Sequence, residues 1–121
     1  YTSLHGKEGL FSDKLNFSRY HNEPIVFQGK HIEVLNDGDE ILLFPNVLLK
    51  AIYTPGHDWS CMSYYTNEVI FTGDSYIPKI KVITSFPKSN KIEAKVSLDR
   101  ILKFCKTRDV YPGHNEIEKH N

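Results

Sequence analysis

Three short motifs each place a potential metal ligand directly after a glycine, at the end of a predicted strand. They are TPGH over residues 54–57, FTGD over residues 71–74 and YPGH over residues 111–114. The glycine permits a tight turn, so the next side chain can point outward from the rim of a sheet. Two imidazoles and one carboxylate form a ligand set suited to Zn, Fe or Mn. If these strands end at one edge, His57, Asp74 and His114 converge there.

In this order, the three motifs resemble the later three metal-binding motifs of the metallo-β-lactamase superfamily, and they are most similar to its glyoxalase-II-like hydrolases. The resemblance extends over residues 25–114. It implies the α+β class and part of a four-layer αββα sandwich, mainly antiparallel sheet with a flanking helix. In the dinuclear site that it implies, His57 binds one ion, His114 binds the other, and Asp74 bridges both.

The same resemblance implies a metal-dependent hydrolase acting on a small-molecule substrate, with thioester, ester-like and phosphoester bonds among the candidates. Two zinc ions, or iron or manganese, would lower the pKa of a shared water to near neutrality. The bridging hydroxide so formed would attack the scissile bond, which makes Asp74 a catalytic residue as well as a ligand. The substrate-binding residues stay open, because fold-level analogy does not identify a particular substrate.

One signature of the superfamily is missing, since no His-x-His and therefore no His-x-His-x-Asp-His occurs in the chain. The only methionine is Met62, so residue 1 is not a translation start. We therefore interpret residues 1–121 as the C-terminal half of such a domain. We expect this half to be inactive alone, without a working dinuclear centre.

Two other functions remain open. A non-catalytic module of the same fold, which lost its upstream ligands and serves interaction, is the second hypothesis. An oxidoreductase with a non-haem di-iron centre is the third, because the same ligand types serve both metals. A His-x-His-x-Asp-His encoded just upstream of Tyr1 would favour the hydrolase over the module.

Several side chains near the motifs have two interpretations. Asp58 either supports His57 or is a solvated loop residue, and Trp59 is either a substrate wall or a core aromatic. Lysines crowd the segment after Asp74, as a solvated face or as an attraction for an anionic substrate. These lysines are Lys79, Lys81, Lys88 and Lys91. The remaining histidines are interpreted as surface or turn residues: His5, His21, His31 and His120.

The elements that must position the motifs are short strands joined by turns. We expect a hairpin with strands over 25–28 and 31–35, and further strands over 40–44, 47–53, 60–66, 69–72 and 109–111, with 81–86 as an additional candidate. Consecutive short strands favour a meandering antiparallel sheet. A short helix is predicted near 7–12, and a longer helix begins after the N-cap Asn90. Its apolar stripe consists of Leu98, Ile101, Leu102 and Cys105.

Composition indicates an ordinary globular chain of 121 residues, with 40% hydrophobic and 25% charged residues. The 15 basic residues balance the 15 acidic ones, which argues against a nucleic-acid binder. The apolar runs are far shorter than the roughly 20 residues of a membrane span. No signal peptide opens the sequence, and Cys61 and Cys105 are interpreted as reduced core thiols, with a single bridge as the alternative. These features predict a cytoplasmic protein.

We divide the chain into an irregular or helical lead-in over 1–23, a sheet with its helix over 24–114, and a polar tail over 115–121. A half sandwich leaves exposed the sheet face that the other half would cover. Large apolar patches of this kind usually mark an interaction surface. We therefore expect self-association, or association with the missing N-terminal half.

Overall fold

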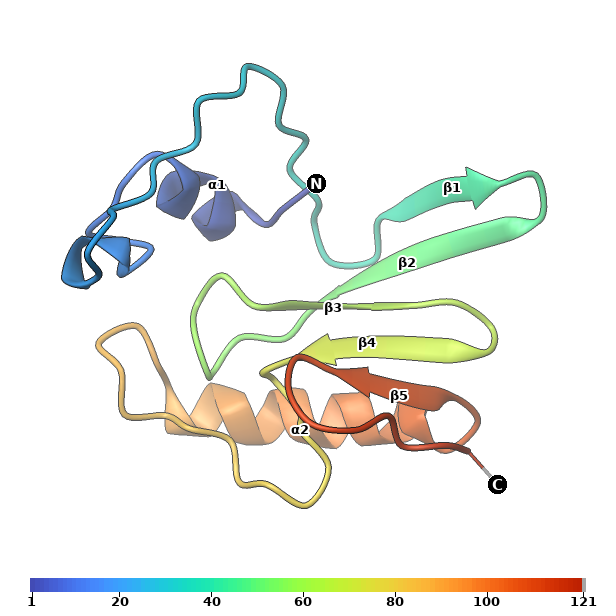
Figure 1. Ribbon diagram of the computed structural model, residues 1–121. Coiled ribbons are helices and arrows are strands. Elements are labelled where there is room, and N and C mark those ends of the chain that lie inside the picture. The colour runs from blue at the N-terminus through green and yellow to red at the C-terminus, as the bar shows by residue number, and fades with distance from the viewer. Residues whose placement is uncertain (121) are drawn as a thin grey trace.

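Five strands form one sheet in the computed structural model, which describes residues 1–120 (Figure 1). The strands are β1 (Glu40–Phe44), β2 (Val47–Tyr53), β3 (Met62–Tyr65), β4 (Val69–Gly73) and β5 (Asp109–Pro112). They lie in the order of the sequence, and every neighbouring pair is antiparallel except β4 and β5, which are parallel. Before the sheet come α1 (Leu4–Leu10) and a short 3₁₀ helix, η1 (Ser18–Tyr20). The fold is therefore a mixed, mostly antiparallel sheet with two α-helices.

The second helix, α2 (Lys91–Cys105), makes the parallel pairing possible, because parallel strands need a long crossover connection. It lies behind the β4 and β5 side of the sheet in Figure 1. The core between them consists of Ile70 in β4, Ile101 in α2 and Val110 in β5, all buried. The predicted N-cap is confirmed, since the Asn90 side chain accepts a hydrogen bond from the Glu93 amide at 2.9 Å.

The face of the sheet turned away from α2 carries many apolar side chains. Pairing and alternation place these side chains on it: Ile41, Leu49, Met62, Tyr64, Val69, Phe71 and Tyr111. Each is half-buried or exposed, and the Phe71 and Tyr111 rings lie 5.4 Å apart. We call these seven side chains the open face, because the described residues leave it largely uncovered.

The predicted hairpin over residues 25–35 is wrong. This segment pairs with the N-terminal residues: the Thr2 amide donates to the Glu33 carbonyl at 3.0 Å, and the Leu35 amide donates to the Thr2 carbonyl at 2.8 Å. Residues 20–31 are all exposed, so their apolar side chains have no face against which a hairpin could be buried. Residues 81–86 contain no strand either.

The first helix begins three residues earlier than the predicted helix over 7–12, because Ser3 caps it by accepting a hydrogen bond from the Gly6 amide at 3.0 Å. The Ser3 hydroxyl also donates to the Ser60 carbonyl at 2.7 Å, which ties this helix to the loop after β2.

Cys61 and Cys105 are free thiols, and Cys61 directly precedes β3. Within residues 1–120, no helix is long and apolar enough to span a membrane.

Candidate functional site

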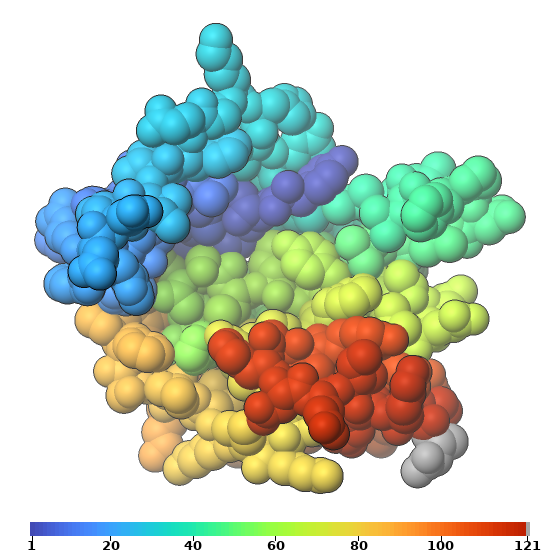
Figure 2. Space-filling model, in the orientation of Figure 1, coloured from blue at the N-terminus to red at the C-terminus, as the bar shows by residue number. Residues whose placement is uncertain are grey.

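The three motif side chains lie at one edge of the sheet because of strand direction. Asp74 follows β4 and His114 follows β5, and these parallel neighbours end at the same edge. Two antiparallel steps, from β2 to β3 and from β3 to β4, bring the end of β2 to that edge as well. The loop after β2 carries His57. Figure 2 shows the C-terminal residues, in red, packed against the yellow segment that follows β4.

A small hollow of about 80 Å³ brings the three side chains together. His57, Asp74 and His114 line it from one side. The other lining residues come from the segment after β4 and are Ile77, Ile80, Lys81, Val82 and Ile83. The polar edge of the sheet therefore meets a largely apolar wall with one ammonium group.

His57 has a defined tautomer. Its Nδ1 atom lies 2.8 Å from the Ile83 carbonyl oxygen, and because a carbonyl can only accept, Nδ1 carries the proton. In the neutral form of the ring Nε2 then carries the lone pair, and this atom lies 3.6 Å from Oδ2 of Asp74. Two acceptors that face each other favour a proton or a cation between them. A main-chain carbonyl holding the far nitrogen of a histidine is typical of metal ligands.

His114 contacts Asp74 in a different manner. Its Nδ1 atom lies 2.7 Å from Oδ1 of Asp74, which is a direct hydrogen bond. Two ligands on one tetrahedral zinc ion are separated by roughly 3.4 Å, given metal–ligand distances near 2.1 Å. The His57–Asp74 separation matches this spacing, whereas the His114–Asp74 separation is too short for an ion between the two atoms.

Asp74 thus joins the two histidines through different oxygen atoms instead of gathering them around one point. Accordingly, residues 1–120 contain no group of three or more His, Cys, Asp or Glu arranged to hold a metal ion. The donor chemistry of His57 and Asp74 fits one edge of a cation site. Completing such a site requires further ligands or a rotation of the exposed His114 ring.

Two glycines of the motifs are required by close approaches. Gly56 has φ +135°, and a Cβ there would lie 2.3 Å from the backbone of Ala94 in α2. The Gly56 carbonyl also accepts from the Asn90 amide at 2.8 Å, so the start of α2 holds the His57 loop. At Gly113, a Cβ would lie 2.5 Å from Oδ1 of Asp74. A side chain is therefore excluded at position 56 by the backbone of α2, whereas one at position 113 would require the Asp74 carboxylate to move.

Buried hydroxyl groups beneath the site set the distance between the His57 and Asp74 turns. The Thr54 hydroxyl lies 2.9 Å from that of Ser63 and 3.1 Å from that of Ser75. The Ser75 hydroxyl in turn donates to the Thr54 carbonyl at 2.9 Å. Sequence reasoning missed these contacts. The threonines inside TPGH and FTGD were the available signal: Thr54 belongs to the network, and the Thr72 hydroxyl makes a separate hydrogen bond to the Tyr76 carbonyl at 2.6 Å.

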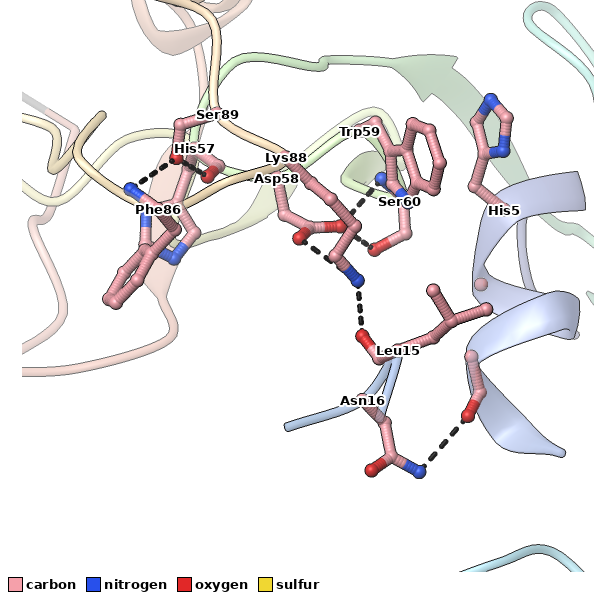
Figure 3. A network of polar contacts seen from close by, with 12 residues as sticks. His5, Leu15, Asn16, His57, Asp58, Trp59, Ser60, Phe86, Lys88 and Ser89 are labelled. Atoms are coloured by element: carbon pink, nitrogen blue, oxygen red, sulfur yellow. Dashed lines mark hydrogen bonds and ion pairs between the residues drawn. The ribbon is translucent and has the colours of Figure 1, made fainter. Parts of the chain in front are cut away.

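Asp58 neither contacts His57 nor lies free in solvent. Its Oδ1 atom accepts from the Ser60 amide at 2.9 Å and from the Ser60 hydroxyl at 2.6 Å (Figure 3). Its Oδ2 atom lies 3.6 Å from Nζ of Lys88, and only 17% and 14% of the two side chains are exposed. Lys88 also donates to the Leu15 carbonyl. This ion pair connects the His57 loop, the segment before α2 and the N-terminal residues.

Aromatic rings complete the surroundings of Lys88. Its Nζ atom lies 4.7 Å from the Phe17 ring centre and 5.7 Å from that of Trp59. Trp59 stacks on His5 at 4.4 Å with 11° between the planes. Trp59 therefore packs against the N-terminal helix, away from the residues that line the hollow. The contact made by His5 was also missed, since nothing in the local sequence marks it.

The lysines after β4 have separate surroundings. Lys88 is paired and largely buried, so it does not belong to a solvated face. Lys81 is exposed and lines the hollow with Asp74, while Lys79 is exposed and has a left-handed backbone conformation, with φ 66°.

Neither cysteine is an activated nucleophile: burial raises the pKa of the Cys61 thiol, and it raises the pKa of the Cys105 thiol to about 11.

Comparison with known proteins gives consistent matches, although no family model matches the chain. The chain is 30% identical over 113 residues to Glyoxylase B2 of Dictyostelium discoideum, covering 89% of this chain and 39% of that protein. It is 25% identical over 124 residues to a Methanocaldococcus jannaschii protein named "Probable metallo-hydrolase", covering 81% and 60%. The structure resembles that of the BLEG-1 B3 metallo-β-lactamase, with a TM-score of 0.83, 21% identity and coverage of 97% and 57%. The chain spans only part of each of these longer proteins.

Proposed function

This chain belongs to the metallo-β-lactamase superfamily, and we propose that it carries part of the catalytic centre of a metal-dependent hydrolase. One observation carries the proposal. The Ile83 carbonyl holds Nδ1 of His57, so that in the neutral ring Nε2 carries the lone pair, and Nε2 lies 3.6 Å from Oδ2 of Asp74. With a neutral His57 ring, a cation held between these two acceptor atoms would stabilise the pair.

His57 and Asp74 would hold one ion in the proposed site, and His114 with the second Asp74 oxygen would hold another after the His114 ring turns from its direct hydrogen bond. Zinc suits two imidazoles and a carboxylate, and iron or manganese accept the same donors. When bound, such ions supply an activated water and a Lewis acid for a carbonyl or phosphoryl oxygen.

The chain's own residues would prepare this chemistry. The Ile83 carbonyl fixes the His57 tautomer, and the hydroxyl network of Thr54, Ser63 and Ser75 fixes the spacing of the two turns. Apolar side chains such as Ile77 and Val82 line the hollow and limit the access of bulk water. We propose an ester, thioester, lactam or phosphoester of a small molecule as the substrate class.

Residues 1–120 do not supply a complete ligand set. The relatives are longer, since the chain covers 39% of one and 60% of another. We propose that the remaining ligands lie outside this chain and that the chain alone is inactive.

Zinc titration by calorimetry tests the metal role. We expect one ion to bind more weakly than micromolar, and the Asp74→Ala variant to lose that binding, with circular dichroism confirming its fold. Sub-micromolar binding of two ions would contradict the view that the ligand set is incomplete. Binding unchanged in the Asp74→Ala variant would remove Asp74 from the ligand set. In a longer protein that includes the upstream ligands, the same substitution should abolish hydrolysis and lower the metal content.

A non-catalytic interaction module is the second candidate function, and the open face of the sheet supports it. The two candidates differ in their response to metal. Zinc binding that requires both His57 and Asp74 favours the hydrolase, whereas association through the open face without any zinc binding favours the module. Analysis of bound iron against zinc would test the third possibility, an oxidoreductase of the same fold.

A further inference from the structure

A second hollow of about 340 Å³ lies between α2 and the segment that follows β4. Its apolar surface includes Ile80 and Val82 on one wall and Leu98 of α2 on the other. Three lysines border it: Lys81 from the first wall, and Lys91 and Lys95 from the helix. We call this hollow the α2 groove, and it differs from the site hollow in that none of the three motif side chains lines it.

The α2 groove is a local concentration of positive charge on a chain with no net charge. None of its lining residues is acidic. Lys95 Nζ lies 3.6 Å from Asp99 Oδ2 in a mostly exposed pair, and within the described part of the chain neither Lys81 nor Lys91 forms an ion pair. Lys91 and Lys95 are one helical turn apart, so both reach the same side of α2.

The position of Lys91 is unfavourable for the helix itself. It is the first residue of α2, where the helix dipole favours acidic side chains and disfavours a cation. The positive end of the helix and the ammonium groups of Lys91 and Lys81 therefore act on the same surface. Glu93 is the acidic residue of this first turn, and an anion in the groove would add negative charge beside the two lysines.

We propose that the α2 groove binds a small amphipathic carboxylate of the fatty-acid type, with its chain on Ile80, Val82 and Leu98 and its carboxylate among the lysines. A volume of about 340 Å³ falls at the lower end of small-ligand sites, which measure roughly 300–1,000 Å³. A protein partner would need a far larger contact than this groove offers. The combination of an apolar floor and a cationic border selects an amphiphile over a simple anion.

This inference does not depend on the metal chemistry, because the groove residues include no metal ligand. The two hollows nevertheless share one wall, since Ile80, Lys81 and Val82 line both. A carboxylate bound in the groove would therefore contact the same segment that borders His57 and Asp74.

Calorimetry and NMR on the whole chain test the proposal, with decanoate and decyltrimethylammonium as probes below their micelle concentrations and decanol below its solubility limit. We expect saturable decanoate binding that shifts amide signals of residues 76–84 and 91–98 and weakens as salt is added. The Lys81→Gln/Lys91→Gln variant should bind decanoate about tenfold more weakly, as expected for the loss of two exposed charge interactions. Its affinity for decanol should not change.

Two matched controls separate the groove from general surface effects. Lys103→Gln removes another exposed lysine of α2 that does not border the groove, and it should leave decanoate binding unchanged. Ile80→Gln should weaken both decanoate and decanol, whereas Ile92→Gln, at a helix position that is 79% exposed, should weaken neither. Equal binding of decanoate and decyltrimethylammonium would overturn the proposal. So would undiminished decanoate binding in the double lysine variant, or binding of an acidic amphipathic peptide without binding of decanoate.

Discussion

The Nε2 atom of His57 lies 3.6 Å from Oδ2 of Asp74, and both atoms are acceptors in the neutral form of the histidine ring. His114 approaches the other carboxylate oxygen at 2.7 Å, close enough for a direct hydrogen bond. The two histidines are therefore not equivalent. The His57 ring is held by the Ile83 carbonyl with Nε2 near the carboxylate, while the His114 side chain is 69% exposed and can turn.

Zinc affinity should follow this difference between the two histidines. We predict that His57→Gln lowers the zinc affinity of the chain by at least about tenfold, because it removes a ligand whose orientation is already fixed. His114→Gln should have the smaller effect, since this ring must first leave its hydrogen bond. Calorimetric titration of both variants at neutral pH measures the two affinities. An equal loss, or a larger loss at His114, would contradict the assigned roles.

Gly113 should be sensitive to the smallest possible side chain. In Gly113→Ala the new Cβ would lie 2.5 Å from Oδ1 of Asp74, so the carboxylate must move. We expect the free energy of unfolding to fall by about 1 kcal/mol or more and the zinc affinity to fall with it. Urea denaturation and zinc titration check the two effects.

Gly9→Ala is the matched control for that substitution. Its Cβ would meet nothing closer than the Asn16 Cβ at 4.0 Å, and the position lies inside α1. An alanine there should stabilise the chain by about 0.5–1 kcal/mol through its higher helix propensity, without altering zinc affinity. If both variants behave alike, the close approach between Gly113 and Asp74 does not constrain the site.

The Asp58–Lys88 pair should contribute to stability more than the other lysine–carboxylate pairs. Lys88→Met keeps the length of the side chain but leaves a largely buried carboxylate without its cation, and we expect a loss of about 1–3 kcal/mol in urea denaturation. Lys95→Met, at a pair in which 79% and 63% of the side chains are exposed, is the control. It should change stability by less than about 0.5 kcal/mol. A Lys88→Met variant as stable as this control would show that the pair does not hold the three segments together.

Local patterns predicted the helix after Asn90 and the strands β1 to β5 because their signals lie within a few residues: a cap, an apolar stripe, and β-prone runs ended by turns. The hairpin over 25–35 failed for the opposite reason. Its β-prone residues are present, but burial decides whether such a run becomes a strand, and residues 20–31 are all exposed. The N-cap at Ser3 was overlooked because the glycines at positions 6 and 9 weaken the helical pattern that follows it.

The meeting of His57, Asp74 and His114 was anticipated from the three motifs and their resemblance, although the parallel pairing of β4 with β5 that brings His114 to this edge was not. The supporting contacts could not be anticipated. The Ile83 carbonyl lies 26 positions from His57, and Lys88 pairs with an aspartate 30 positions away, so neither contact has a local signature. Residues that position a ligand depend on the tertiary path of loops, whereas residues that bind it are marked by their chemistry.

Both thiols should react slowly in the folded chain. Burial disfavours the thiolate and raises the pKa of Cys105 to about 11, against roughly 8.5 for an unfolded cysteine. At pH 8.5, alkylation of Cys105 by iodoacetamide should therefore be slower by roughly two orders of magnitude than in urea. Because the folded pKa is the higher one, this group's contribution to stability is complete below about pH 8.5 and is lost as the pH rises toward 11. Mass spectrometry of the labelled peptides separates Cys105 from Cys61. Equal rates in folded and unfolded chain would contradict the burial of these thiols.

The open face should cause the isolated chain to associate with a second copy of itself at micromolar concentration. Its side chains are apolar, adjacent and at most half-buried, and a surface of this kind is normally covered by a partner. Phe71 lies near its centre and is 42% exposed, so Phe71→Lys should disrupt association without disturbing the core. Ile92→Lys adds the same charge at a helix position outside this face and should leave association intact. Sedimentation velocity at several concentrations distinguishes the two variants. If the unaltered chain sediments as a compact monomer throughout, the described residues satisfy the face by themselves, and neither a second copy nor a missing half is needed to cover it.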